Sequence, residues 1–579
     1  MAIPVENTTA DEKVDDFENH FKVSAGPGAG KTRWLINHIN NVIRNSTRLG
    51  NSRKIACITY TNVAMEIILE RLGKQIDRVE VSTIHGFLYK HIIKPFAFLI
   101  PKEYELKIED IDGHDEIPIY KGWLYEWKKL TKQTYLSDDD KIAAAFKDLS
   151  WQFNESNELV LKTRKSYTSR IGDYSIKKES FIEYKKMYWR KGILDHEDVL
   201  FFSYILLKKN ARLVDVVRAK FPYFFIDEFQ DTNPIQTAIL NILAEKETKV
   251  VVIGDVAQSI YGFQGAMPSQ FANFNLPTIK HLEILDNHRS TKKIVKLLNT
   301  IRKDIAQNSK REVVGTEVYI LVGSKNWAVK AAEVLSNGEV YSLSRDNITS
   351  NVMRSKSNLS ISSKNMIEEL KGIDSNGDRV SLVIALVKGV ELARQNKFKE
   401  SFKELNKEIK RIDGILEYQK TSLLILKKLL ANYDSLKNKT LLEFHSYIVT
   451  TFLIKLAGFK AGGIKTFYGN HTFEELALSV NIIEDTSYHR TIHKAKGAEF
   501  KNVLLVLDRR NSSNEFLEVK ELEFLLEPNL NDDEEHRIKY VALSRARDNL
   551  FINIPSLTDE SKVKLEAQGF TVKKEIVSA

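Results

Sequence analysis

The residues best suited to do chemistry stand together in one glycine-rich loop, Ala25-Gly26-Pro27-Gly28-Ala29-Gly30-Lys31-Thr32, which continues into Arg33. The loop matches the phosphate-binding pattern G-x-x-x-x-G-K-[ST], with alanine in place of the first glycine. In such a loop, backbone N–H groups surround phosphate oxygens, the lysine reaches the β- and γ-phosphates, and the threonine hydroxyl is a ligand of Mg²⁺. We therefore expect a nucleoside triphosphate and Mg²⁺ to bind here. An ordinary loop between a strand and a helix is the alternative.

Two carboxylates follow another apolar run. Tyr223–Ile226 is predicted to be a buried strand, and Asp227 and Glu228 come directly after it, where parallel sheets bind their ligands. Asp227 could hold Mg²⁺, directly or through water, and Glu228 could polarise an attacking water. A solvated turn does not explain acids placed directly after four apolar residues. The next apolar run, Val250–Ile253, leads to Gln258, whose amide could orient a water or sense a γ-phosphate.

Aromatic residues and histidines follow several of these strands. Tyr261 and Phe263 are separated by a single glycine, which leaves an aromatic face accessible for stacking. Tyr60 follows the apolar run Lys54–Thr59, and His85 lies at another strand-to-helix turn. Taken alone, Tyr60 and His85 could be packing residues, and a core position for Phe263 is nearly as well supported as stacking.

The elements that must position these groups alternate as in a parallel α/β sheet. An amphipathic helix follows the phosphate loop, and a second helix, Val63–Leu72, is predicted to end at Gly73. A second sheet domain is expected from four later apolar runs, namely Glu317–Val322, Val340–Ser344, Val503–Leu507 and Leu550–Ile554.

Two stretches interrupt the alternation and are predicted to be mostly helical insertions, at about residues 94–190 and 347–481. The first carries tyrosine, tryptophan and lysine together at Tyr120–Lys132 and Tyr184–Lys191. This composition permits contact with a nucleic-acid strand, although a charge run is usually a solvated face. The second contains long helical patterns, at Val380–Lys397 and Phe402–Leu430, and no recognisable chemistry.

Composition sets broad limits. A chain of 579 residues is too long for one core, and its net charge of +9 is compatible with a nucleic-acid partner but weak evidence for one. The single cysteine, Cys57, forbids an internal disulfide and a cysteine-cluster metal site. No cationic start with an apolar segment and no apolar run of spanning length occur, so we expect a cytoplasmic protein without membrane contact.

An ordered series of blocks resembles the superfamily 1A DNA helicases of the UvrD, Rep and PcrA type. The blocks run in family order over nearly the whole chain: Ala25–Thr32, Thr59–Ala64, Ser82–Phe87, Leu194–Leu200, Ile226–Gln236, Ile253–Ala266, Leu285–Ser290, Arg490–Phe500 and Tyr540–Leu550. The resemblance implies an α/β fold of two tandem RecA-like P-loop domains, each with an inserted subdomain, that hold ATP between them. It places the first domain at 1–93 and 191–276, its insertion at 94–190, the second domain at 277–346 and 482–579, and its insertion at 347–481.

The resemblance also implies residue roles. Arg289 and Arg545 would clamp the γ-phosphate during hydrolysis, Gln258 would link the nucleotide to the second domain, and Glu499 would contact the nucleotide from that side. Positions that line the single-strand path in relatives are matched by Tyr60, Thr61, Asn62, Thr83, His85, Tyr261, Phe263 and His493. Stacking there needs no particular base.

The sequence departs from the family pattern in places. The adenine-reading glutamine that usually precedes the phosphate loop is absent, since the first glutamine is Gln75, so ATP is inferred from the family alone. The arginine that commonly follows the aromatic residue of the Gln258 block is here Gln264. Few residues follow the Tyr540–Leu550 block, so we expect no C-terminal nuclease domain.

Two functions remain open. The first is a 3′-to-5′ motor on single-stranded or partly duplex DNA, in repair or phage defence. The second is a DNA-gated ATPase subunit that activates a partner nuclease. Diverged relatives of this type occur as the helicase-like partner of OLD-family nucleases in Gabija-type antiphage systems. An RNA-directed motor is a third, less favoured reading. Oligomeric state is not indicated.

Overall fold

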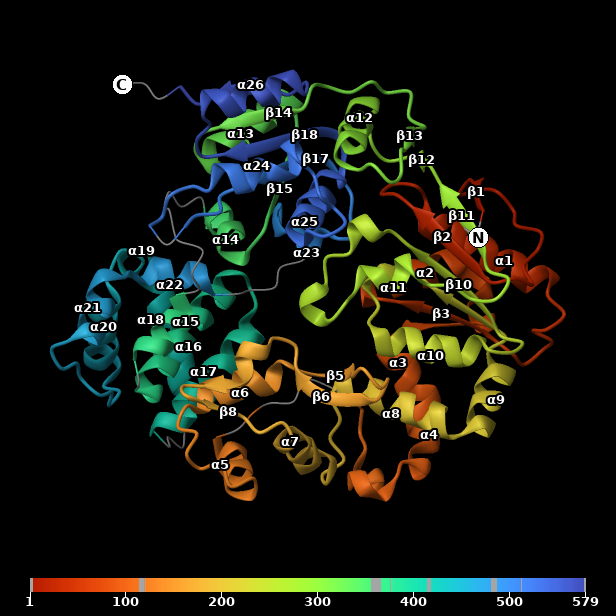
Figure 1. The fold of residues 1–579 in the computed structure, drawn as a ribbon. Coiled ribbons are helices and arrows are strands. Elements are labelled where there is room, and N and C mark those ends of the chain that lie inside the picture. The colour runs from red at the N-terminus through yellow and green to blue at the C-terminus, as the bar shows by residue number, and fades with distance from the viewer. Residues whose placement is uncertain are drawn as a thin grey trace. The chain divides into compact units, whose positions relative to one another are not determined.

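The computed structural model in Figure 1 describes residues 4–113, 119, 121–355, 366–374, 376–413, 418–480, 487–511 and 513–576. The chain divides into two compact units. Unit 1 comprises Met1–Ser290, Arg302–Glu312 and Leu530–Arg537, and unit 2 comprises Thr291–Ile301, Val313–Asn529 and Ile538–Ala579.

A parallel sheet forms the centre of unit 1. Within the described residues it has seven strands in the spatial order β1-β11-β2-β10-β9-β3-β4. Their bounds are β1 Val5–Thr8, β2 Phe21–Ala25, β3 Ile55–Thr59, β4 Val79–Thr83, β9 Tyr223–Ile226, β10 Lys249–Gly254 and β11 Lys280–Ile284. The apolar runs predicted the central strands, which are buried on both faces as parallel strands usually are.

Both faces of this sheet are covered, because successive side chains of a strand point to opposite sides. In β10, Val251 and Ile253 pack in the same apolar cluster as helix α1 (Lys31–Asn45). Val250 and Val252 pack in a second cluster with α10 (Pro234–Ala244) and α8 (His196–Lys209). The carboxyl ends of the strands therefore meet at one edge between two helical layers, where a ligand site is expected.

The first insertion is only partly helical. Helices α5 (Lys121–Leu130), α6 (Asp139–Lys147) and α7 (Ser180–Trp189) agree with the prediction. The helical prediction is wrong for the middle, where strands pair antiparallel: β5 (Leu149–Phe153) with β6 (Leu159–Thr163), and β7 (Arg170–Ile171) with β8 (Tyr174–Ser175). Asn157, at φ 56, makes the tight turn between β5 and β6.

The aromatic residues of this insertion mostly form its core. Trp127, Tyr184, Tyr188 and Trp189 are each at most 5% exposed, and they belong to the same cluster as the sheet residues Phe224 and Val252. These four rings are therefore not available for stacking on a nucleic acid, whereas Tyr125 of the same insertion is 67% exposed.

Unit 2 contains a second parallel sheet. Its strand order within the described residues is β16-β15-β17-β18-β14-β19. The bounds are β14 Tyr319–Val322, β15 Tyr341–Ser344, β16 His489–Thr491, β17 Phe500–Val506, β18 Ala546–Ile554 and β19 Thr571–Lys574. Two parallel sheets flanked by helices confirm the predicted fold class.

The second insertion is a helical layer with its own core. Helices α16 (Gly377–Arg394), α17 (Phe398–Asp413), α18 (Tyr418–Ala431) and α20 (Leu441–Phe452) share one apolar cluster. The long pattern predicted at Phe402–Leu430 corresponds to α17 and α18, and residues 414–417 between them lie outside the described residues. Among the helices described, none has both the length and the apolar character needed to cross a membrane.

A buried histidine in α1 makes the stability of unit 1 depend on pH. His38 is 3% exposed and stacks on Trp34 with ring centroids 4.9 Å apart. Burial lowers the pKa of His38 from its ordinary value near 6.5 to about 4. Below pH 6.5, His38 is therefore protonated in the unfolded chain but stays neutral in the folded chain. The free energy of unfolding consequently falls as the pH drops toward 4.

We expect His38→Phe, which keeps a ring in this position, to remove that part of the pH dependence. The free energy of unfolding of the wild type should fall by about 2 kcal/mol more than that of the variant between pH 7 and pH 5. Urea denaturation followed by tryptophan fluorescence measures the difference. His288→Asn, at an exposed position, is the control and should retain the wild-type slope. Equal slopes for His38→Phe and the wild type would contradict the assignment.

Candidate nucleotide and strand-binding sites

The phosphate loop joins β2 to α1 and presents an uncapped helix end. Gly28 and Gly30 have φ values of 71° and 89°, a region that favours glycine. Gly30 is the N-cap of α1, which has no side-chain cap and no acidic residue in its first turn. Its first N–H groups and the positive end of the helix dipole are thus oriented to bind an anion. The Lys31 ammonium lies over the loop, 3.3 Å from the Ala25 oxygen and 3.4 Å from the Gly26 oxygen.

Residues far along the chain hold this loop in place. Asn287 and Gln307 each donate a side-chain hydrogen bond of 3.0 Å to the carbonyl oxygen of Pro27. The Asn287 amide also donates to the Gln307 oxygen at 3.2 Å, and both side chains are nearly fully buried. The backbone N–H of His288 donates to the Gly28 oxygen at 2.9 Å. The loop conformation is therefore fixed from outside as well as by its own glycines.

Arg289 lies beside the phosphate loop. A Cβ on Gly28 would be 2.7 Å from the Arg289 Cβ, and a Cβ on Gly26 would be 2.5 Å from the Gln307 side chain. The Arg289 backbone is held at both ends, because its N–H donates to Asn287 Oδ1 at 3.0 Å and its oxygen accepts from Arg311 at 2.8 Å. The structure thus places the Arg289 backbone and Cβ beside the phosphate loop, and the action of Arg289 on a phosphate stays a prediction.

The two predicted acids follow β9. Asp227 is 6% exposed, and its Oδ1 accepts from the Glu228 N–H at 3.0 Å. Glu228 has φ 52, an uncommon conformation for a residue with a side chain. Because β10 alone separates β9 from β2, Asp227 and Thr32 lie at the same sheet edge. Their oxygen atoms are the type of ligand that Mg²⁺ prefers, so this edge fits the ion.

A buried polar network connects Glu228 with Gln258. The Gln230 amide donates to Glu228 Oε2 at 2.5 Å, and its oxygen accepts from the Asp255 N–H at 2.9 Å. The Asp255 carboxylate accepts from the Gln258 amide and pairs with Arg302 Nη1 at 2.7 Å. Glu228 and Gln258, the two residues expected to act on water and the γ-phosphate, are therefore held by partners that are hydrogen-bonded to each other.

The predicted aromatic residues form a cluster at the same edge. Tyr60 and Tyr261 stack on each other with centroids 4.8 Å apart and an angle of 22°. The Tyr60 hydroxyl donates to the Gln264 side chain. Phe263 lies 6.0 Å from Tyr261 and is 57% exposed, which excludes the core position considered from the sequence. The exposed Phe263 ring and the stacked Tyr60–Tyr261 pair thus form a surface on which a planar ligand can stack.

Other residues predicted for strand binding also serve the fold. The Thr61 hydroxyl accepts from Ala64 N–H at 3.1 Å and caps α2 (Asn62–Leu72), while Thr83 caps α3 (Ile84–Leu88). His85 stacks on His196 with centroids 4.9 Å apart. The side chain of Asn62 lies outside the described residues.

Three predicted residues belong to unit 2. Arg545 is 2% exposed, and its Nη1 donates to the Ala498 oxygen at 3.3 Å. Glu499, which follows Ala498 directly, is exposed, and the Arg545–Ala498 contact brings it close to Arg545. His493 lies in the short helix α23 (Ile492–Ala495) after β16. Joint action of Arg289 and Arg545 on one phosphate remains a prediction.

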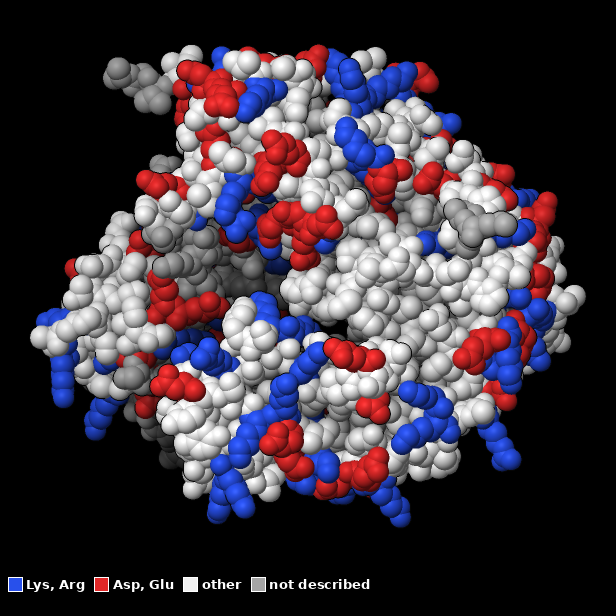
Figure 2. Space-filling model, viewed as in Figure 1, with Lys and Arg blue, Asp and Glu red and all other residues white. Residues whose placement is uncertain are grey.

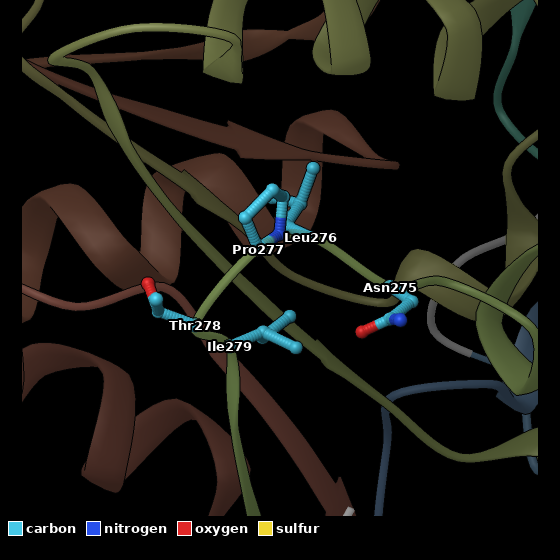
Figure 3. A pocket seen from close by; sticks show the side chains of 5 residues that line it. All are labelled: Asn275, Leu276, Pro277, Thr278 and Ile279. Carbon is cyan, nitrogen blue, oxygen red and sulfur yellow. The ribbon is translucent and has the colours of Figure 1, made fainter. Parts of the chain in front are cut away.

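Other surface features carry no comparable chemistry. The loop Asn275–Ile279, between α11 (Pro268–Ala272) and β11, lines a pocket without a titratable side chain (Figure 3). Figure 2 shows acidic and basic side chains intermingled on the face in view. Within the described residues, no group of three or more histidine, cysteine, aspartate or glutamate residues could hold a metal ion.

Sequence reasoning missed several residues that hold the site, namely Asn287, Gln307, Gln230, Asp255 and Arg302. Asn287, Gln230 and Asp255 lie inside blocks that the sequence singled out, so their position was a usable signal. Nothing local distinguishes Gln307 or Arg302.

Comparison with known proteins identifies two family models in the chain. The UvrD/REP helicase N-terminal domain matches residues 6–279, and the UvrD-like helicase C-terminal domain matches residues 383–556. Together they cover most of the chain.

Similar individual proteins include a Gabija protein and two DNA helicases. The Gabija protein GajB of Bacillus cereus is 27% identical over 48% of this chain and 46% of its own length. The ATP-dependent DNA helicase Rep of Escherichia coli is 29% identical, covering 48% and 40%. The ATP-dependent DNA helicase PcrA of Staphylococcus aureus is 27% identical, covering 53% and 41%. The matches thus span less than half the length of each of these relatives.

The packing around Gly28 predicts a sharp effect of one added methyl group. Gly28→Ala should weaken nucleotide binding by about tenfold or more, because its Cβ has to displace Arg289 and Asn287. Titration with a fluorescent ATP analogue measures the dissociation constant. Gly50→Ala is the matched control, since Gly50 also has a positive φ, of 48°, but no atom within 4 Å of its added Cβ. Similar affinities for the two variants would argue against this cradle.

Proposed function

The chain belongs to the UvrD-like helicase family, and on this basis we propose that it is an ATP-driven motor on single-stranded DNA. The observation that carries the proposal is the common sheet edge of unit 1. There the phosphate loop, Arg289, Glu228 and the Tyr60–Tyr261 cluster follow strands of one sheet. A nucleotide site and a stacking surface on one rigid element allow the state of one to influence the other.

We propose that ATP binds with its phosphates on the uncapped N-terminus of α1 and Lys31. Glu228 accepts a proton from the attacking water, and Gln258 orients that water or the γ-phosphate. Arg289 and Arg545 spread the charge that develops on the transferred phosphoryl group. Mg²⁺, held by Thr32 and Asp227, would supply charge neutralisation at the phosphates.

We propose that the aromatic cluster grips bases irrespective of sequence. Phe263 offers an exposed face, and every base has a face on which it can stack. Thr61, Asn62, Thr83, His85 and His493 would line the same path, with travel in the 3′-to-5′ direction as in the helicases it resembles. We also propose that the two domains and their insertions meet where the sequence predicts, after residues 93, 190, 276, 346 and 481.

A second function is favoured by one similar protein. The relative named Gabija protein GajB suggests a role in phage defence, in which this chain is a DNA-gated ATPase that activates a partner nuclease. In that case hydrolysis reports the presence of DNA ends or single strands and need not separate a duplex.

Two substitutions test the nucleotide chemistry. Lys31→Ala should abolish DNA-stimulated ATP hydrolysis because the phosphates lose their cation. Glu228→Gln should bind ATP normally but slow its hydrolysis by roughly 100-fold or more, because the proton acceptor is lost. Phosphate release and nucleotide titration measure the two effects. Lys74→Ala, at an exposed position, is the control. Hydrolysis retained by Lys31→Ala would refute the assignment.

The two functions differ in strand displacement. A 3′-tailed duplex, incubated with ATP beside a DNA-stimulated hydrolysis assay, should be unwound by a motor. Hydrolysis without displacement would favour the sensor, and copurification with a nuclease would support it. Stronger stimulation by RNA than by DNA would overturn both.

A further inference from the structure

The first turn of α25 (Glu534–Leu543) contacts both ends of the segment Ser259–Gly262 within unit 1. The Gly262 N–H donates to Glu534 Oε1 at 2.8 Å, and Arg537 Nε donates to the Ser259 oxygen at 2.8 Å. Residues three positions apart on a helix share one face, so both contacts arise from the same side of one turn. The segment between them carries the stacking residue Tyr261.

Arg537 is built into this contact as a buried cation. It is 6% exposed, and its Nη1 also donates to the oxygens of Leu530 and Asn531, each at 3.0 Å. Burial lowers the pKa of Arg537, although a guanidinium stays charged in proteins. A buried charge is tolerated when it is fully hydrogen-bonded, and the forked group fixes three carbonyl oxygens at once. Arg537 therefore sets where the Ser259 carbonyl lies.

The Ser259 end leads to the groups of the nucleotide site. Ser259 follows Gln258 directly, and its hydroxyl donates to the backbone carbonyl oxygen of Gln230 at 3.0 Å. The Gln230 amide in turn donates to Glu228 Oε2 at 2.5 Å. Ser259 and Gln230 are both nearly fully buried, so these bonds are shielded from water. A displacement of Ser259 therefore reaches Glu228 through two hydrogen bonds, both made by Gln230.

The Gly262 end leads to the stacking surface. Gly262 stands between Tyr261 and Phe263, and a Cβ on it would be 2.8 Å from both carboxylate oxygens of Glu534. A Cβ at position 262 would therefore displace the Glu534 carboxylate from its present place. Glu534 thus holds the backbone between the two aromatic side chains.

We propose that Glu534 and Arg537 are positioning residues that couple the seating of a DNA strand on Tyr261 and Phe263 to the placement of Glu228 and Gln258. Stacking of a base shifts the segment Ser259–Gly262, and the first turn of α25 sets how that shift is transmitted. The inference rests on the proposed ATP-driven function and deepens it by naming the residues that make hydrolysis respond to DNA.

The first test is Glu534→Ala, with Glu126→Ala at an exposed site as control. We expect the ratio of DNA-stimulated to basal ATP hydrolysis to fall about tenfold, because a hydrogen bond to a charged group is lost. The loss should appear in the DNA-stimulated kcat, while the KM for ATP and the affinity for an oligothymidine strand change little. A purely structural role would instead lower the melting temperature and leave the ratio intact, which would overturn the proposal.

A double-mutant cycle removes the dependence on any single variant. Gly262→Ala should lower the same ratio because its Cβ meets the Glu534 carboxylate. In the Glu534→Ala background the added methyl group has space, so the double variant should be no worse than Gly262→Ala alone. Additive losses would overturn the proposal.

Arg537→Lys keeps the positive charge but loses the forked guanidinium, and Arg537→Gln loses both. We expect both variants to lower the ratio of DNA-stimulated to basal ATP hydrolysis. The outcomes separate this inference from the proposed function. Absence of DNA stimulation in the wild type would refute both. Normal stimulation in the wild type, Glu534→Ala and the double variant would refute this inference alone.

Discussion

The carbonyl oxygen of Pro27 is the point on which the nucleotide site depends. It accepts hydrogen bonds from Asn287 and Gln307, two side chains more than 250 residues further along the chain. Both donors are buried, so the loss of this acceptor would leave one amide N–H of each unsatisfied, at a cost of roughly 1–3 kcal/mol each. The same contacts bring Gln307 against Gly26 and Arg289 against Gly28, where there is no room for a side chain. One acceptor therefore links the shape of the phosphate loop to the position of the arginine expected to act on the phosphate.

Buried charges serve two different purposes in unit 1. Asp255 and Arg302 pair beneath the nucleotide edge and hold the side chains of Gln258 and Gln230. Lys185 is also buried, but it pairs with Asp195 and Asp198 at the start of α8, where the two aspartates form the helix cap. Burial and Asp195 raise the pKa of Asp198. The two aspartates of the block Leu194–Leu200, which helped to indicate the family, thus stabilise the start of α8.

Sequence predicted those parts of the molecule whose signal is local. Buried parallel strands such as β3, β9 and β10 are continuous apolar runs, and the phosphate loop is a compact pattern of glycines with Lys31 and Thr32. Strand β11 was not predicted because Lys280, His281 and Glu283 interrupt its apolar residues. The hairpin β5–β6 was not predicted because polar residues such as Ser150, Gln152 and Lys162 interrupt its short apolar runs. Gln307 and Arg302 act through contacts with distant segments, and no local pattern reveals such contacts. The mutual stacking of Tyr60 and Tyr261 was missed for the same reason.

The apolar cluster that joins the sheet to the first insertion restricts how this architecture can change. Trp127 and Trp189 of the first insertion share one apolar core with Phe224 of the sheet, so the insertion packs directly on the sheet. Deleting residues 94–190 would expose a broad apolar surface of the unit 1 sheet to water. A variant that lacks the insertion would therefore fold only if polar side chains replaced this apolar surface or a neighbouring molecule covered it.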